Sequence, residues 1–73
     1  MKIQYMREFI AFDEYGNFSK TAQSMYITQP ALSRHVAEME KELGVKLLER
    51  NKHSVSFTEA GLKVYKQLRK IIQ

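Results

Sequence analysis

The sequence contains no cysteine, no long apolar run and no glycine-rich phosphate loop among its 73 residues. Without cysteine, neither a disulfide nor a thiolate metal site can stabilise the fold. The core must therefore come from aliphatic, methionine and aromatic side chains, or from a partner chain. No apolar stretch is long enough to span a membrane, and residues 1–8 lack the uninterrupted apolar segment of a secretion signal. These absences lead us to expect a cytoplasmic protein without a membrane-spanning segment.

Patterns typical of catalysis and metal binding are also missing. The two histidines, His35 and His53, lack the cysteine or paired-carboxylate spacing of a metal site. His35 stands close to Ser33 and Arg34, and this group does not match a nucleophile and a base with an orienting acid. We therefore expect no enzymatic activity, no cofactor and no metal ion.

Length and charge indicate one small domain with a mild basic excess. A domain of 73 residues buries little surface per residue and is marginally stable alone. Twelve bases and eight acids give a net charge of +4. Such an excess favours a polyanionic partner such as DNA, RNA or an anionic membrane surface.

Apolar spacing predicts a mainly helical fold. Residues 3–15 carry apolar side chains at helical intervals, and Gly16 and Asn17 are expected to end that helix because both tolerate the left-handed conformation. Ser19 is placed to cap a short second helix by accepting a hydrogen bond from a free backbone N–H. Together these features predict two helices joined by a tight turn.

A third helix follows, with its charge distributed unevenly. Thr28 can cap it, Pro30 suits its first turn, and Gly44 ends it. The apolar stripe of this helix is formed by Leu32, Val36, Met39 and Leu43. Residues 28–37 contain no acid, whereas residues 38–43 contain three carboxylates. The amino end of the helix can therefore approach phosphates, and the acidic end should point away from them.

Side chains at that amino end suit the edges of base pairs. Gln29 can both donate to and accept from adenine, and Arg34 can bind guanine through two hydrogen bonds or clamp a phosphate. Both lie out of phase with the apolar stripe. We predict base contacts from Thr28, Gln29, Pro30, Ala31, Ser33 and Arg34.

Residues 46–57 predict a small two-stranded hairpin. Val55 and Phe57 alternate with serines, which is the period of a half-buried strand, and the polar residues before them suit a hairpin tip. A basic tip can follow a phosphate strand or enter the minor groove. We predict contacts to the DNA backbone or minor groove from Ser19, Lys20, Arg50, Lys52 and His53.

A fourth helix is expected to begin after Thr58, which can cap it, and to continue to the last residue. No Gly, Asn or Pro follows Ile72, so we expect a chain cut inside a helix. The apolar residues of this helix occupy a broad sector, which either covers the first helix or packs against a second chain. We predict dimer contacts from Leu62, Tyr65, Leu68 and Ile72.

Five segments of the sequence resemble the N-terminal region of LysR-type transcriptional regulators of bacteria. They are Gly-Asn-Phe-Ser-Lys-Thr-Ala (16–22), Ile-Thr-Gln-Pro-Ala-Leu-Ser-Arg (27–34), Met-Glu-Lys-Glu-Leu-Gly (39–44), Leu-Leu-Glu-Arg (47–50) and Phe-Thr-Glu-Ala-Gly (57–61). The resemblance extends over nearly the whole chain. It differs at two positions: His53 stands where many members carry arginine, and Asp13 stands where a small apolar residue is preferred.

The resemblance implies a winged helix-turn-helix fold: a three-helix core, a small two-stranded β wing and a C-terminal linker and dimerisation helix. The DNA-binding domain would cover residues 1–57, with the helix-turn-helix at about 18–37, the recognition helix at about 29–43 and the wing at about 46–57. Residues 58–73 would begin a truncated dimerisation helix. The recognition helix would enter the major groove of double-stranded DNA, and the wing holding Arg50 would reach the minor groove.

The resemblance also implies partners. Homodimers, or tetramers of the full-length protein, would bind inverted-repeat operators and activate or repress transcription. A small-molecule effector would act through a C-terminal domain that this chain lacks.

Two other functions share the same scaffold. A winged helix can bind protein in place of DNA, although an exposed apolar patch at the start of the third helix would then be more usual. A structured RNA is a weaker alternative, because the deep groove of an RNA duplex excludes a helix. The Thr-Gln-Pro run could serve capping alone, and Arg34 could be an ordinary solvated side chain.

Overall fold

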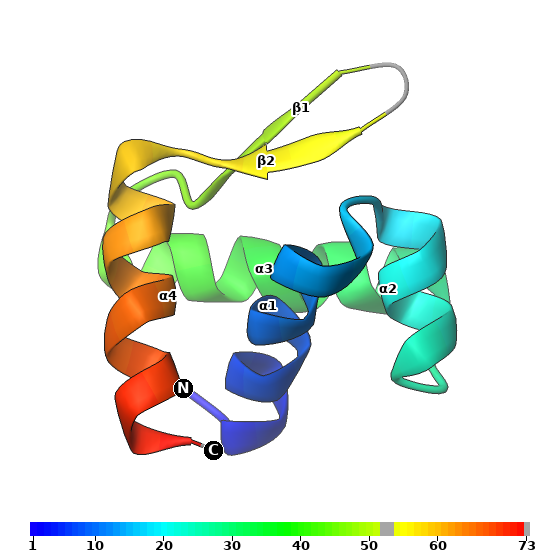
Figure 1. Cartoon of the computed structure of the whole chain (residues 1–73), viewed down its shortest axis with the longest axis horizontal. Coiled ribbons are helices and arrows are strands. Elements are labelled where there is room, and N and C mark those ends of the chain that lie inside the picture. The colour runs from blue at the N-terminus through cyan, green and yellow to red at the C-terminus, as the bar shows by residue number, and fades with distance from the viewer. Residues whose placement is uncertain (52–53, 73) are drawn as a thin grey trace.

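The computed structural model describes residues 1–51 and 54–72, which form four helices and one antiparallel hairpin (Figure 1). The elements, in chain order, are α1 (Ile3–Tyr15), α2 (Phe18–Ser24), α3 (Gln29–Leu43), β1 (Leu48–Arg50), β2 (Val55–Phe57) and α4 (Glu59–Ile71). Leu48 pairs with Phe57 and Arg50 with Val55. The predicted helices and the hairpin are confirmed, but α4 does not continue to the end of the chain as expected. It ends at Ile71, and the backbone of Ile72 is extended. No helix in the described part of the chain is long and apolar enough to cross a lipid bilayer.

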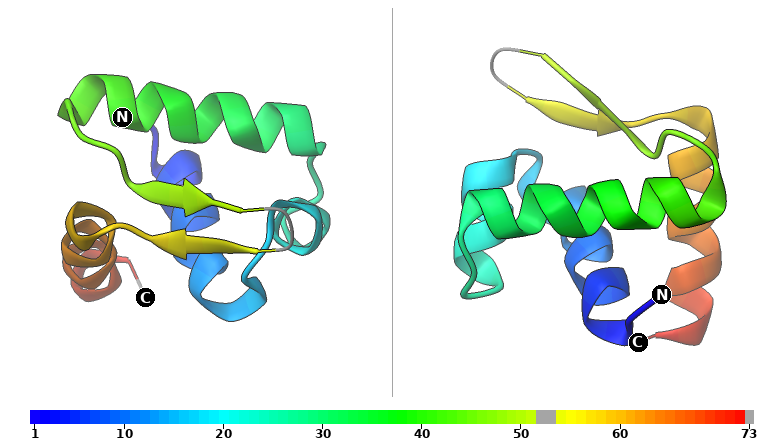
Figure 2. Two further views of the ribbon diagram at one scale, coloured as in Figure 1. Left: turned by 90° about the horizontal axis from the view of Figure 1, so that it is seen from above. Right: turned by 180° about the vertical axis from the view of Figure 1, so that it is seen from behind.

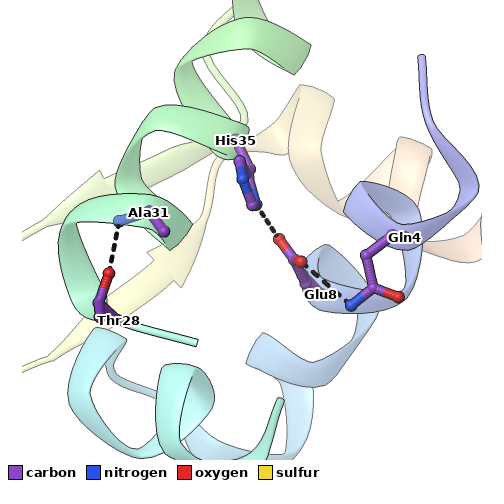
Figure 3. Close-up of polar contacts among 5 residues, drawn as sticks. All are labelled: Gln4, Glu8, Thr28, Ala31 and His35. Atoms are coloured by element: carbon purple, nitrogen blue, oxygen red, sulfur yellow. Dashed lines mark hydrogen bonds and ion pairs between the residues drawn. The ribbon is translucent and has the colours of Figure 1, made fainter. Parts of the chain in front are cut away.

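The helix ends follow local capping chemistry. The Thr28 hydroxyl accepts a hydrogen bond from the Ala31 N–H at 3.2 Å, which confirms the predicted cap of α3 (Figure 3). The Thr58 hydroxyl caps α4 in the same way, accepting from the Gly61 N–H at 2.9 Å. Gly44 ends α3 in the left-handed conformation, with φ +73°. These predictions succeed because each depends on residues a few positions apart.

The predicted cap of α2 is wrong. Asn17, in an extended conformation, caps this helix, and its side-chain oxygen accepts from the Lys20 N–H at 2.7 Å. Of Gly16 and Asn17, Gly16 takes the left-handed conformation, so the cap of α2 lies two residues earlier than expected and the helix begins at Phe18. Ser19 therefore lies inside the first turn of α2, exposed to solvent.

The core lies where α1 meets the other three helices and the base of the hairpin. Helix α1 contacts α2, α3 and α4, and Figure 2 shows α3 running from α2 at one end to α4 at the other. The core is formed by Phe9, Phe12, Ala22, Leu32, Val36, Met39, Leu47, Leu48, Val55 and Leu68. Three positions of the predicted α3 stripe are buried, but Leu43 is 40% exposed because it lies in the last turn, beyond the core.

Helix α4 begins in unusually close contact with the backbone before the hairpin. The Thr58 N–H donates to the Leu47 carbonyl at 3.0 Å, and the Thr58 hydroxyl donates to the Lys46 carbonyl at 2.6 Å. A Cβ atom placed on Gly61 would stand 1.9 Å from the Leu47 carbonyl oxygen. Only glycine fits there, so Gly61 sets the position of α4 against the hairpin.

The hairpin is held by the helical segments on both strands, at its base on β1 and beside its tip on β2. On β1, the Glu40 carboxylate of α3 accepts from the Leu47 N–H at 2.8 Å and from the Leu48 N–H at 3.3 Å. On β2, the Val55 N–H donates to the Gly16 carbonyl at 3.0 Å. The two strands are therefore held by different helical segments.

Candidate nucleic-acid interface

The amino end of α3 presents polar side chains to solvent. Thr28, Gln29, Pro30 and Arg34 are exposed, and Leu32 beside them is fully buried. Ala31 and Ser33 are half-buried. The predicted outward projection of Gln29 and Arg34 is therefore what the structure shows, since the helix rotation that buries Leu32 turns them away from the core.

Four of the predicted contact residues line one open cleft. The cleft has a volume of about 470 Å³ and lies between the first turn of α2, the first turn of α3 and the hairpin. Ser19 and Lys20 line it from α2, Gln29 from α3 and Arg50 from β1. Residues from three segments of the sequence thus meet on one face. Lys52 and His53, also predicted for this face, lie outside the described residues.

The acids of α3 gather at its other end, and most of them are held there by partners. Glu40 accepts hydrogen bonds from the two backbone N–H groups at the hairpin base. Glu42 pairs with the Met1 amino group at 3.1 Å. Burial and a hydrogen bond to Glu38 raise the pKa of the Tyr5 phenol. The two ends of α3 therefore differ as predicted in charge. They also differ in bonding, because the acids at the carboxyl end have partners within the chain and the acid-free amino end is exposed.

Arg50 lies against the helices. Its Nη2 donates to the Ser33 Oγ at 2.8 Å, and its Cζ lies 4.0 Å from the centroid of the Phe18 ring. The two predicted contact residues Arg50 and Ser33 are therefore bonded to each other. Sequence patterns do not indicate this bond, because seventeen residues separate the partners.

A buried contact between Glu8 and His35 under α3 was not predicted from the sequence. The Glu8 carboxylate, 1% exposed, lies 2.6 Å from the His35 Nδ1 and accepts a further hydrogen bond from the Gln4 amide at 3.2 Å (Figure 3). The Tyr5 ring stacks on the imidazole, with 4.0 Å between centroids. The pair joins α1 to α3 directly beside Arg34, so it fixes how the exposed face of α3 is oriented.

The residues predicted to form dimer contacts differ in how far they are exposed. Leu68 and Ile72 are each 8% exposed, because α4 covers α1 within the same chain. Tyr65 is half-buried and stacks on Phe57, with 5.0 Å between centroids. Leu62 is 42% exposed and remains free to contact another surface. Most of the broad apolar sector is thus used inside the chain.

Asp13, the unusual polar residue of α1, has a partner on α4. The Tyr65 hydroxyl donates to its Oδ2 at 2.8 Å and accepts from Arg69 at 2.9 Å. The hydrogen bond to Asp13 raises the pKa of the Tyr65 phenol. Asp13 therefore links the first and last helices.

Comparison with known proteins identifies relatives over almost the whole chain. A Pectobacterium carotovorum subsp. carotovorum protein named "Hydrogen peroxide-inducible genes activator" is 38% identical over 73 residues, covering all of this chain and 24% of the relative. The Cupriavidus pinatubonensis "HTH-type transcriptional regulator TfdT" is 41% identical over 61 residues, covering 84% of this chain and 27% of the relative. The chain spans about a quarter of the length of these relatives.

Solved structures give the same result. The BenM DNA-binding domain in complex with catB site 1 DNA superposes with a TM-score of 0.92 at 38% identity, covering 99% of this chain and 80% of that one. The CbnR DNA-binding domain in complex with DNA superposes with a TM-score of 0.93 at 33% identity, covering 99% of this chain and 83% of that one. The family model described as "Bacterial regulatory helix-turn-helix protein, lysR family" matches residues 3–62. The chain therefore belongs to the lysR family of bacterial regulatory helix-turn-helix proteins.

Proposed function

We propose that this chain binds double-stranded DNA in a sequence-specific manner, as the DNA-binding domain of a bacterial transcriptional regulator. The observation that carries the proposal is the acid-free amino end of α3, where Gln29 and Arg34 are exposed. Lys20 and Gln29 line the cleft between this end and the hairpin. Two similar structures are DNA complexes, and the related proteins are named as regulators, which agrees with a non-enzymatic role in the bacterial cytoplasm.

In this proposal the first turns of α3 enter the major groove. Gln29 and Arg34 meet base edges, Pro30 and Ala31 offer apolar contact to a thymine methyl, and Thr28 stays at the helix start where free N–H groups favour phosphate. Phosphate contacts from α2 fix the register on the duplex without reading its sequence. The same approach brings the hairpin toward the neighbouring minor groove, where Lys52 and His53 would follow the backbone.

Two copies of the domain would bind an inverted-repeat operator. Two-fold symmetry places the recognition helices one or more helical turns apart, about 34 Å per turn. Leu62 supplies exposed apolar surface on α4 for such pairing. The relatives are about four times longer than this chain, so we infer that effector binding and assembly into tetramers would depend on further domains.

Selection of bound sites from random DNA duplexes, followed by footprinting, tests the function. We expect enrichment of one motif with two-fold symmetry and protection in the major groove of each half-site. A duplex RNA of matched length, used as competitor at fixed salt, should not displace the selected DNA. Recovery of no motif, or equal competition by RNA, would contradict sequence-specific DNA binding.

Replacing Arg34 with alanine should weaken binding to the selected site by about 1–3 kcal/mol if the guanidinium reads a base. The loss should be smaller on a scrambled duplex, because only the selected site offers the matching base edge. Titration of both duplexes by fluorescence anisotropy measures the difference. Full affinity of Arg34→Ala for the selected site would remove Arg34 from the reading surface.

Lys20→Ala provides the contrasting variant. Lys20 is exposed on α2 and is proposed to contact only phosphate, so its loss should weaken selected and scrambled duplexes alike. The slope of log K against log salt should fall by about one. An unchanged salt slope would show that Lys20 does not contact the DNA backbone.

A further inference from the structure

Three residues from three elements meet beside the cleft. Arg50 of β1 donates to the Ser33 Oγ of α3 at 2.8 Å, and its guanidinium lies over the Phe18 ring of α2 at 4.0 Å. The Phe18 ring is itself held edge-on against Phe12 in the core, with 4.9 Å between centroids. The guanidinium therefore has a fixed position that is determined by packed residues, although Arg50 itself is exposed.

The chemistry of the Arg50–Ser33 bond gives the Ser33 hydroxyl a direction. A guanidinium has donors and no acceptor, so the serine oxygen must accept in this bond. Within the described part of the chain, Ser33 makes this side-chain hydrogen bond and no other. Its own proton therefore points away from the cation and is available to a further acceptor. Accepting from a charged donor also polarises the hydroxyl, which makes it a stronger donor and a poorer acceptor.

We propose that Arg50 sets the base preference of Ser33 by presenting its hydroxyl as a hydrogen-bond donor. This inference rests on the proposed function. Donor-oriented Ser33 selects base edges with acceptors, namely purine N7, guanine O6 or thymine O4. It disfavours the amino groups of adenine N6 and cytosine N4. Arg50 is thus a positioning residue for sequence reading, in addition to any phosphate it neutralises.

Two variants locate and test the effect. Ser33→Ala removes the hydroxyl, so random-duplex selection should show one base position at which discrimination falls about fivefold, the worth of one hydrogen bond. Arg50→Met removes the donor while keeping a side chain that can pack on Phe18. It should flatten the preference at that same position and leave preferences elsewhere intact. The double variant should lose no more discrimination there than Ser33→Ala alone.

Lys46→Met is the matched control, because Lys46 is an exposed cation that lines a hollow together with Ser33 and Arg50. It should weaken binding to all duplexes and leave every base preference unchanged. Arg50→Lys, which keeps the charge but lacks the planar group that stacks on Phe18, should retain affinity and lose part of the preference. Thermal unfolding of each variant verifies that it is folded.

Failure of this inference and failure of the proposed function give different experimental results. If Arg50→Met lowers affinity uniformly, as Lys46→Met does, then Arg50 supplies only charge and the inference is wrong. If Ser33→Ala leaves all preferences unchanged, Ser33 reads no base and the inference is equally wrong. If the unaltered chain selects no motif, the proposed function itself fails, and this result is distinguishable because it precedes any variant.

Discussion

Replacement of His35 by leucine should destabilise the domain by about 4 kcal/mol, since it leaves the Glu8 carboxylate buried without its partner. That carboxylate is 1% exposed, and the remaining hydrogen bond from Gln4 cannot replace the lost interaction. A small domain has a total free energy of unfolding of only about 4–11 kcal/mol, so this variant should be largely unfolded in mild denaturant. Urea unfolding followed by circular dichroism measures the change.

Two controls separate the effect of leaving Glu8 buried without its partner from simple loss of packing contact. Glu8→Leu combined with His35→Leu removes both polar groups, so it should recover most of the stability lost in the single variant. His35→Gln, which can still donate to Glu8, should cost much less than His35→Leu. A double variant as unstable as His35→Leu would show that packing around the imidazole, including the stacked Tyr5 ring, carries the effect instead.

Replacement of Gly61 by alanine should cost about 3 kcal/mol, because the new Cβ would stand 1.9 Å from the Leu47 carbonyl oxygen. Helix α4 can relieve this contact only by moving away from the hairpin base, which breaks the hydrogen bonds that Thr58 makes to Lys46 and Leu47. The cost exceeds the gain of about 1 kcal/mol that alanine gives over glycine inside a helix. Denaturant unfolding again measures the difference.

Lys66→Ala is the matched control for Gly61→Ala. Lys66 lies exposed in the interior of the same helix, so alanine there should change stability by less than about 0.5 kcal/mol. An alanine variant of Gly61 as stable as the unaltered chain would mean that α4 is not held in close contact with Leu47.

The parts of the fold that could be predicted from the sequence depend on neighbours along the chain. The helix ends are examples, because each follows from the chemistry of one residue next to a segment with helical apolar spacing. They are the caps at Thr28 and Thr58 and the left-handed ends at Gly16 and Gly44. The start of α2 could not be assigned in this way. Asn17 and Ser19 are both good caps two residues apart, and the backbone turn at Gly16 decides between them.

The exposure of the candidate site residues could be predicted where it follows from helix phase, and their contacts could not be predicted where long-range pairing decides them. Gln29 and Arg34 point outward because the stripe of α3 turns inward. Glu8 stands among the apolar positions of the first helix, where a polar residue is usually exposed, yet it is buried because His35, 27 residues later, lies opposite it. Likewise, nothing local indicates that Arg50 folds back to Ser33 instead of extending along the hairpin.

The anchoring of the hairpin has a mechanical consequence for how the domain fits a duplex. Leu47 and Leu48, at the start of β1, are bonded to the Glu40 carboxylate, and Val55 of β2 is bonded to the Gly16 carbonyl, so both strands are tied to the helical segments. In the proposed complex, the protein would therefore set the distance between α3 and the hairpin strands. A mismatch with the groove width would then be absorbed by bending or twisting of the nucleic acid, and the domain would disfavour stiff sequences at positions that no side chain touches.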